Sequence, residues 1–145
     1  MENLVVDGYN VIHAWDSLRT LLPVSLEAAR DALIDRLAVY GQMTGSRVTV
    51  VFDAHQTAAS QVNRAVRDGV YVVFTRRRES ADHLIERIAY DAAKQRSPIL
   101  VASSDRFHRD MLRGMGAAVI DAGELERRVL DAERSLRDRL RRGEY

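Results

Sequence analysis

LVVDGYN, residues 4–10, is the stretch that decides the fold. Its apolar start is too short and too uniform for an amphipathic helix and predicts a buried strand over residues 3–7. The strand ends in Asp7, and Gly8 allows the chain to turn there. Asn10 follows three residues after the acid. A turn needs the glycine but needs neither the carboxylate nor the amide. This pair of oxygen-bearing side chains therefore indicates a role other than forming the turn.

Four more apolar segments have the character of buried strands. Their ranges are 47–54, 70–75, 99–103 and 117–121. Because they are continuously apolar and separated by helical patterns, they predict a parallel sheet covered on both faces. We therefore expect an α/β fold with a mainly parallel central sheet and helices on both faces.

Apolar residues at helical spacing predict helices after Ser25 and after Ser80, both of which are candidate N-caps. A short helix follows the fourth strand, and its expected inward side chains are Met111, Leu112 and Met115. The last helix spans about 123–142, with an apolar face that ends at Leu140. Residues 55–69 are the least determined and form either a loop or a short helix that contains Val62 and Val66.

The composition is that of a globular protein, with 46% hydrophobic and 30% charged residues in a chain of 145. This length predicts a single domain over residues 1–145. No apolar run reaches the roughly 20 residues that span a bilayer, and the chain has no cysteine. We expect a cytoplasmic monomer without a membrane anchor, a disulfide or a thiolate metal site.

Net charge is +1, so no overall field indicates a polyanionic partner. Of the 22 basic residues, however, only Lys94 is a lysine. Genomic base composition can produce this bias, but arginine also offers forked donors that suit phosphate.

Four aspartates fall at or just after the carboxyl ends of predicted strands. Asp7, Asp53 and Asp105 follow the first, second and fourth strands, and Asp82 lies in the first turn of the helix after the third. Each acid taken singly can be a turn or N-cap residue. Ligands of open parallel sheets bind at this edge, however, and clustered carboxylates require a shared proton or a cation. An all-oxygen set favours Mg²⁺ or Mn²⁺, which can activate water against a phosphodiester.

Other enzymes with acids at strand ends fit less well. A haloacid-dehalogenase-type phosphatase needs a second acid where this chain has Tyr9, and a receiver domain needs a lysine after a late strand, whereas Lys94 ends a helix. Glycine-rich nucleotide-binding loops are absent from the sequence.

Four blocks of sequence together resemble the YacP-like branch of the NYN domains, bacterial ribonucleases of the wider PIN-like group. The blocks are LVVDGYNVIHAW (4–15), VVFDAH (50–55), VVFTRRRESAD (72–82) and LVASSDRFHRDM (100–111). They run in order through nearly the whole chain. The resemblance implies a PIN-like (NYN) α/β domain and cleavage of RNA with Mg²⁺ or Mn²⁺. It also implies messenger RNA as substrate, in association with the ribosome.

The resemblance also implies roles for particular residues. Asp7, Asp82 and Asp105 would hold metal and water, and Asn10 would orient a ligand or the scissile phosphate. The supporting residues would be Asp53, Glu79, Ser103 and Ser104.

Candidate RNA contacts are the arginine run at positions 76–78, Arg106 and His55. The run consists of Arg76, Arg77 and Arg78, between the third strand and the Asp82 helix. A solvated charge run and a surface-loop histidine are the competing explanations. The arginines of the last helix alternate with acids, which usually marks a solvated face but also suits ribosomal RNA.

Two further functions remain open at this point. One is a noncatalytic RNA- or ribosome-binding module, against which retention of the three acids argues. The other is a metal-dependent phosphatase acting on a small phosphate ester with the same acids.

Overall fold

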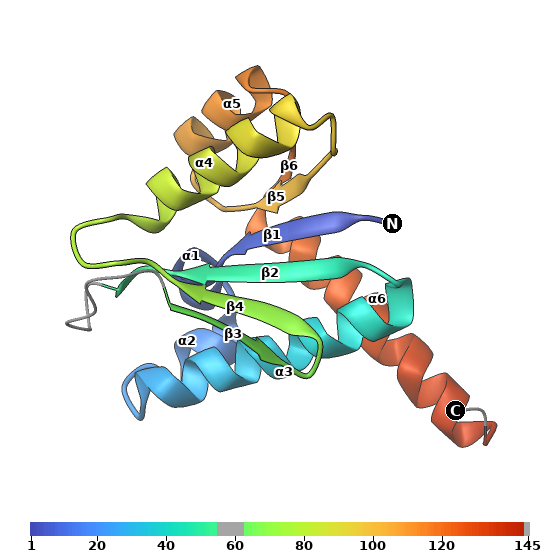
Figure 1. Ribbon diagram of the computed structural model, residues 1–145. Coiled ribbons are helices and arrows are strands. Elements are labelled where there is room, and N and C mark those ends of the chain that lie inside the picture. Colours follow the sequence, from blue (N-terminus) through green and yellow to red (C-terminus); the bar gives the residue numbers. More distant parts are fainter. Residues whose placement is uncertain (55–62, 144–145) are drawn as a thin grey trace.

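The computed structural model describes residues 1–54 and 63–143, and its centre is a twisted six-stranded sheet (Figure 1). The strands lie in the order β3-β4-β2-β1-β5-β6. All neighbours pair in parallel except β3 and β4, which are antiparallel. The strands are β1 (Asn3–Asp7), β2 (Arg47–Phe52), β3 (Asn63–Arg67), β4 (Val70–Phe74), β5 (Leu100–Ala102) and β6 (Ala118–Ile120).

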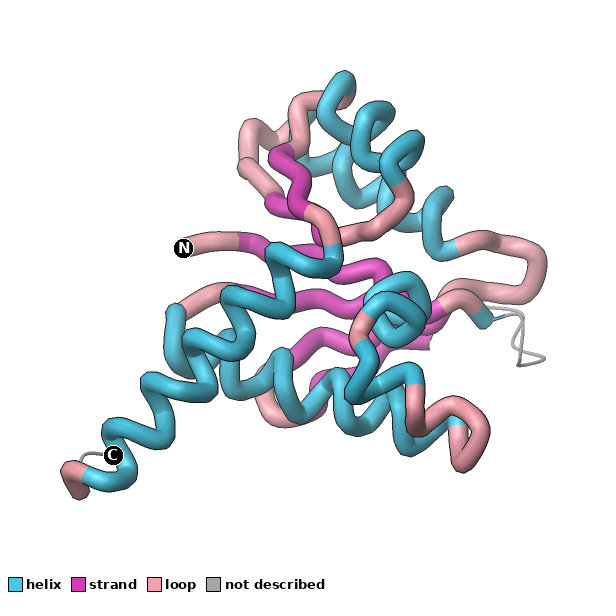
Figure 2. The backbone as a smooth tube through the Cα atoms, turned by 180° about the vertical axis from the view of Figure 1, so that it is seen from behind, coloured by secondary structure: helices cyan, strands magenta, loops and turns pink. Residues whose placement is uncertain are grey.

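Six helices accompany this sheet in the described part of the chain. They are α1 (Gly8–Ala14), α2 (Asp16–Arg19), α3 (Leu26–Thr44), α4 (Ala81–Lys94), α5 (Arg106–Gly114) and α6 (Ala122–Arg141). Helices α3 and α6 cross one face of the sheet, as the view from behind shows, while α4 and α5 lie on the other side (Figure 2). The expected α/β architecture with helices on both faces is confirmed.

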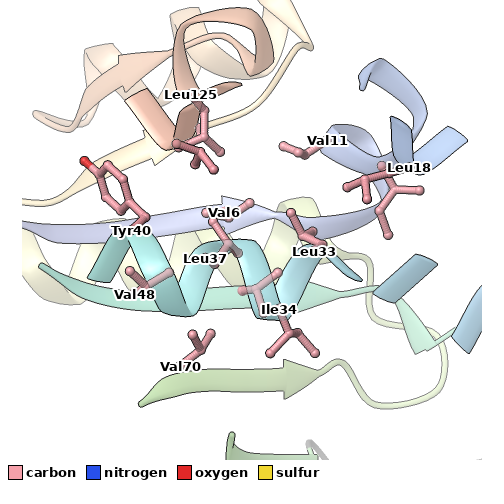
Figure 3. Packing of buried hydrophobic residues seen from close by; sticks show 14 of the residues in the cluster. Val6, Val11, Leu18, Leu33, Ile34, Leu37, Tyr40, Val48, Val70 and Leu125 are labelled. Carbon is pink, nitrogen blue, oxygen red and sulfur yellow. The ribbon is translucent and has the colours of Figure 1, made fainter. Parts of the chain in front are cut away.

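Each face of the sheet has its own hydrophobic core because successive strand residues point to opposite sides. Val6 of β1 packs with Leu37 of α3 and Leu125 of α6 in the larger core (Figure 3). Val5, its neighbour in the same strand, belongs to the second core with Leu84 of α4. This double burial explains why β1 is continuously apolar.

Within the segment 55–69, the described residues 63–69 differ from the prediction of a loop or a short helix. Residues 63–67 form β3, which is joined to β4 by a hairpin turn with positive φ at Asp68 and Gly69. Asp-Gly is a strong hairpin signal that the sequence contained. Every residue of β3 is exposed, so no alternation of apolar residues revealed it. Val62 lies outside the described residues.

One other expectation about apolar residues, that Met111 points inward, was wrong. Met111 is 40% exposed and faces away from the core, whereas Leu112 beside it is fully buried. Leu140 is 49% exposed because α6 extends past the sheet beyond Ala132, its last buried residue. No helix among residues 1–54 and 63–143 is long and apolar enough to cross a membrane.

Helix α1 begins directly at Gly8, where the sequence suggested only a turn. A Cβ added at Gly8 would lie 2.3 Å from Cε1 of Phe52 and 3.0 Å from the carbonyl oxygen of Val51. Glycine is therefore required by the close approach of α1 to β2, which fixes how the chain leaves Asp7.

Candidate metal centre

The candidate metal centre lies at the carboxyl edge of the sheet, where three elements bring ligand atoms together. Asp7 ends the central strand β1, Asp82 is in the first turn of α4, and His108 is in α5. One ligand atom from each lies within 4.8 Å of the other two. Asp7 and His108 are buried, whereas the Asp82 side chain is 46% exposed. The centre is therefore open to solvent on the Asp82 side.

Asp7 is the residue at this edge whose pKa is strongly shifted. Its pKa is raised from 3.8 to about 7, first by burial and then by the charge of Asp82. The backbone N–H of Asn10 lowers the pKa, and the charges of Asp105 and Asp53 raise it further. Asp105 and Asp53 are thus close enough to act on Asp7. A bound cation would offset this repulsion and favour the ionised carboxylate.

His108 was missed by the sequence interpretation, which gave it no role. Its Nδ1 lies 3.5 Å from Oδ1 of Asp82, and its Nε2 lies 3.6 Å from Oε1 of Glu86. Neither ring nitrogen has a hydrogen-bond partner, although the residue is buried. The separation of 82 and 108 along the chain forms no local motif, so only the packing of α5 against α4 reveals the pair. This buried nitrogen donor fits a divalent ion.

Asp105 occupies a different position from the one expected of a metal ligand. It is exposed and is the N-cap of α5, where its Oδ1 accepts a hydrogen bond of 3.2 Å from the His108 N–H. In the described part of the chain it does not join the set whose ligand atoms lie within 4.8 Å. Its helix-capping role positions the backbone that carries His108.

A hydrogen bond of Asn10 links the segment that follows β1 to the segment that follows β5. The side-chain oxygen of Asn10 accepts a hydrogen bond from the Ser104 N–H. The preceding residue, Ser103, is buried and its hydroxyl accepts from the Asp105 N–H at 3.2 Å. Asn10, Ser103 and Ser104 therefore shape the loop between β5 and α5.

Glu79 is buried close to the start of α4 and is held by arginines. Its Oε2 lies 2.8 Å from Nη1 of Arg87, and its Oε1 lies 4.0 Å from Nε of Arg76. The rest of the arginine run, Arg77 and Arg78, is exposed, and Arg78 adopts a positive φ of 71°. Glu79 is outside the three-residue set. Its contacts with Arg76 and Arg87 stabilise the turn that contains the arginine run.

The other candidates are placed as follows. Arg106 is exposed at the first position of α5, and Asp53 is half-buried after β2. His55 lies outside the described residues. A cavity of about 520 Å³ between Val5, Tyr71 and Ile88 includes none of these candidates and is separate from the metal centre.

The fold and the candidate metal centre define a single-domain α/β protein of the PIN-like nuclease class. The chain belongs to the YacP-like NYN domain family, whose model matches residues 4–144. The family implies a nuclease-type function related to RNA.

Two kinds of relative agree with this assignment. The chain is 41% identical over 142 residues to a protein described as the uncharacterized protein YacP of Bacillus subtilis (strain 168), covering 98% of this chain and 83% of the relative. It also resembles the crystal structure of Rae1 (YacP) from Bacillus subtilis, with a TM-score of 0.84, 41% identity and coverage of 98% and 81%. A tryptophan-to-leucine variant of that protein gives a TM-score of 0.83, 41% identity and coverage of 98% and 83%.

Proposed function

We propose that this protein is a metal-dependent endoribonuclease that hydrolyses phosphodiester bonds in RNA. The observation that carries the proposal is the convergence of Asp7, Asp82 and His108 within 4.8 Å at the carboxyl edge of the sheet, in a chain of a nuclease-type family.

Asp7 and Asp82 would hold a divalent ion such as Mg²⁺ or Mn²⁺, with Asp105 acting on it through Oδ2 or through a water. When bound, such an ion lowers the pKa of a coordinated water and stabilises negative charge on phosphate. Asp7 must be ionised to bind it, so its raised pKa predicts that ion binding strengthens as pH rises through about 7. Asn10 holds the β5–α5 loop in place and so positions Asp105.

The surface around the centre suits a polyanionic polymer. Arg77 and Arg78 are exposed on the loop before α4, and Arg106 is exposed at the start of α5. These three arginines would contact RNA phosphates. Because the candidate metal centre is open to solvent at Asp82, it is accessible to an RNA strand and does not enclose a small molecule. Following the family resemblance, we propose messenger RNA as the substrate, in a cytoplasmic and ribosome-associated context, and a monomeric enzyme.

A cleavage assay on a structured messenger RNA tests the proposal. Wild type is incubated with Mn²⁺, with Mg²⁺ or with chelator, in purified form and in a translating extract. Asp82→Asn is compared with Asp91→Asn, a matched change of an exposed acid near the far end of the same helix.

We expect internal cleavage that requires the ion, is lost in Asp82→Asn and persists in Asp91→Asn. Binding of RNA without cleavage in either context would instead support a noncatalytic binding module. Hydrolysis of a small phosphate ester with RNA left intact would identify a phosphatase.

A further inference from the structure

His108 is buried between two carboxylates and has no hydrogen bond to either. The side chain is 2% exposed, so water does not satisfy its ring nitrogens. Both nitrogens lack a hydrogen-bond partner, yet each faces a carboxylate of α4 at 3.5–3.6 Å. Burial of an unsatisfied polar group is unfavourable, and native proteins rarely leave one without a reason.

We infer that His108 is a nitrogen ligand of the metal centre and that it makes the centre select a divalent transition-metal ion over Mg²⁺. Nδ1, which faces Asp82, is the ligating atom, and Glu86, on the Nε2 side of the ring, is the positioning residue. The inference rests on the proposed metal centre of Asp7 and Asp82, not on cleavage of RNA.

The positions of the two carboxylates determine which ring nitrogen is available. A neutral imidazole has one N–H and one lone pair. Glu86 is on the Nε2 side, and a carboxylate there favours the tautomer protonated at Nε2. Asp82, on the Nδ1 side, belongs to the three-residue set and Glu86 does not, so Nδ1 is the nitrogen that faces the metal centre. The Nδ1 lone pair and the Asp82 carboxylate are both electron-rich, and a cation between them would bind both.

A doubly protonated imidazolium bridging Asp82 and Glu86 is the competing explanation. Such a ring would donate through both nitrogens and would draw the carboxylates to about 2.7–2.9 Å. The observed 3.5 and 3.6 Å separations are longer, and neither is a hydrogen bond. The 3.5 Å between Nδ1 and Oδ1 of Asp82 is a separation that two ligands of one ion adopt when each binds it at about 2.0–2.2 Å.

The nitrogen donor sets the ion preference. Mg²⁺ favours oxygen ligands and keeps several waters, whereas imidazole suits first-row transition metals. Replacing one oxygen ligand by Nδ1 of His108 therefore weakens Mg²⁺ relative to Mn²⁺ or a later ion. The ring is buried, so the nitrogen donor belongs to the packed interior and not to a surface side chain.

Electron spin-echo spectroscopy on the wild-type chain with one equivalent of Mn²⁺ tests the ligand directly. We expect a ¹⁴N coupling of directly bound imidazole. A spectrum of bound Mn²⁺ that contains only oxygen and water couplings would overturn the inference. This measurement needs no substitution in the buried core.

Variants test the selectivity. Mn²⁺ affinity is measured by the loss of the free-ion paramagnetic resonance signal, and Mg²⁺ affinity by competition, in wild type, His108→Gln, His108→Glu and His13→Gln. His13 is exposed on α1 and serves as the matched histidine control. We expect His108→Gln to lose the ¹⁴N coupling and to reduce the Mn²⁺/Mg²⁺ affinity ratio about tenfold. His108→Glu should reduce the ratio by binding Mg²⁺ more tightly, and His13→Gln should leave it unchanged. An unaltered ratio in both folded His108 variants would contradict the inference.

Glu86 has its own test. Glu86→Ala should weaken Mn²⁺ binding about 10–100-fold, because the ring loses the group that orients it. Glu86→Gln retains an oxygen acceptor for Nε2–H and should restore most of the affinity and the ¹⁴N coupling. Equal loss in both variants would mean that Glu86 does not act by orienting His108. Because all these measurements omit RNA, ion binding with a nitrogen ligand but without cleavage would reject only the nuclease proposal.

Discussion

The ends of β1 and β5 have the same local design but carry acids of different character. In both, an aspartate follows the strand and occupies the N-cap position of the next helix. Asp7 makes no side-chain capping bond, is buried, and has a pKa raised to about 7. Asp105 caps α5 and is exposed. Burial and partners, not position after a strand, determine which of the two is poised to hold a cation.

The difference originates in the sheet. β1 is central, with β2 and β5 on its two sides, so its end lies beneath the loops of both neighbours. β5 is shorter and is followed by a loop that Asn10 holds from the β1 side. Asp7, at the end of β1, therefore lies at the buried base of the candidate metal centre. Asp105, after β5, lies at its exposed rim.

The largest effect should be on catalysis. Asp7→Asn removes a buried ligand and should reduce RNA cleavage by about 10³-fold, corresponding to several kcal/mol of lost charge stabilisation. Asp105→Asn keeps the helix cap and should reduce it less. Cleavage rates at saturating Mn²⁺ measure both. An equal loss would erase the proposed distinction between base and rim.

The same substitution should have the opposite effect on stability. Because folding raises the Asp7 pKa from 3.8 to about 7, the folded state favours the protonated acid. Wild type without metal therefore loses stability as pH rises from about 4 to about 7, by up to about 4 kcal/mol. Asp7→Asn should be free of this loss, so its advantage should grow over that interval.

Urea unfolding with chelator between pH 4 and 8 measures the effect. Asp121→Asn is the control, since Asp121 is an exposed N-cap of α6 and asparagine also caps helices. A constant difference between Asp7→Asn and wild type across this range would show that Asp7 has an ordinary pKa.

Gly8 tests how tightly the β1 end is packed. Gly8→Ala places a methyl group against Phe52 and the Val51 carbonyl and should destabilise the fold by about 1–3 kcal/mol. Gly114→Ala near the end of α5 meets no atom within 4 Å and is the matched control. Thermal unfolding should separate them, and equal melting temperatures would show that α1 can move away from β2.

Asn10 tests the link between the two ends. Asn10→Ala leaves the Ser104 N–H without its acceptor and should cost about 1 kcal/mol in stability. Asn10→Asp keeps an acceptor and should retain stability better at low pH, where the new acid is neutral. Denaturant unfolding of both variants measures the free energy of unfolding. Equal stability of Asn10→Ala and wild type would show that the hydrogen bond between Asn10 and Ser104 does not stabilise the fold.

The smallest effect concerns the Asp105 cap. Asp105→Ala should destabilise α5 by about 1 kcal/mol, whereas Asp105→Asn should preserve its stability. Amide hydrogen exchange in residues 106–114 gives the local measurement. Equal protection in the two variants would show that the cap contributes nothing.

Much of the fold followed from periodicity, but β3 and His108 did not. β3 contains no buried side chain, so its only local signal was the Asp68-Gly69 turn. His108 lies on a short helix beside charged residues, so no local pattern marked it as a buried side chain. Its burial depends on α4, whose Asp82 and Glu86 carboxylates lie on either side of it.

The sequence by itself determined the parallel α/β sheet and the placing of acids at strand ends, because strand burial and helix periodicity are local properties of residue order. It also indicated the family through the four ordered motifs, the first of which starts at Leu4. Tertiary structure alone decided that Asp7 is buried, that Asp105 is a capping residue and that His108 meets Asp82. Those outcomes depend on distances between elements far apart in the chain, and the desolvation that raises the Asp7 pKa exists only once those elements have packed.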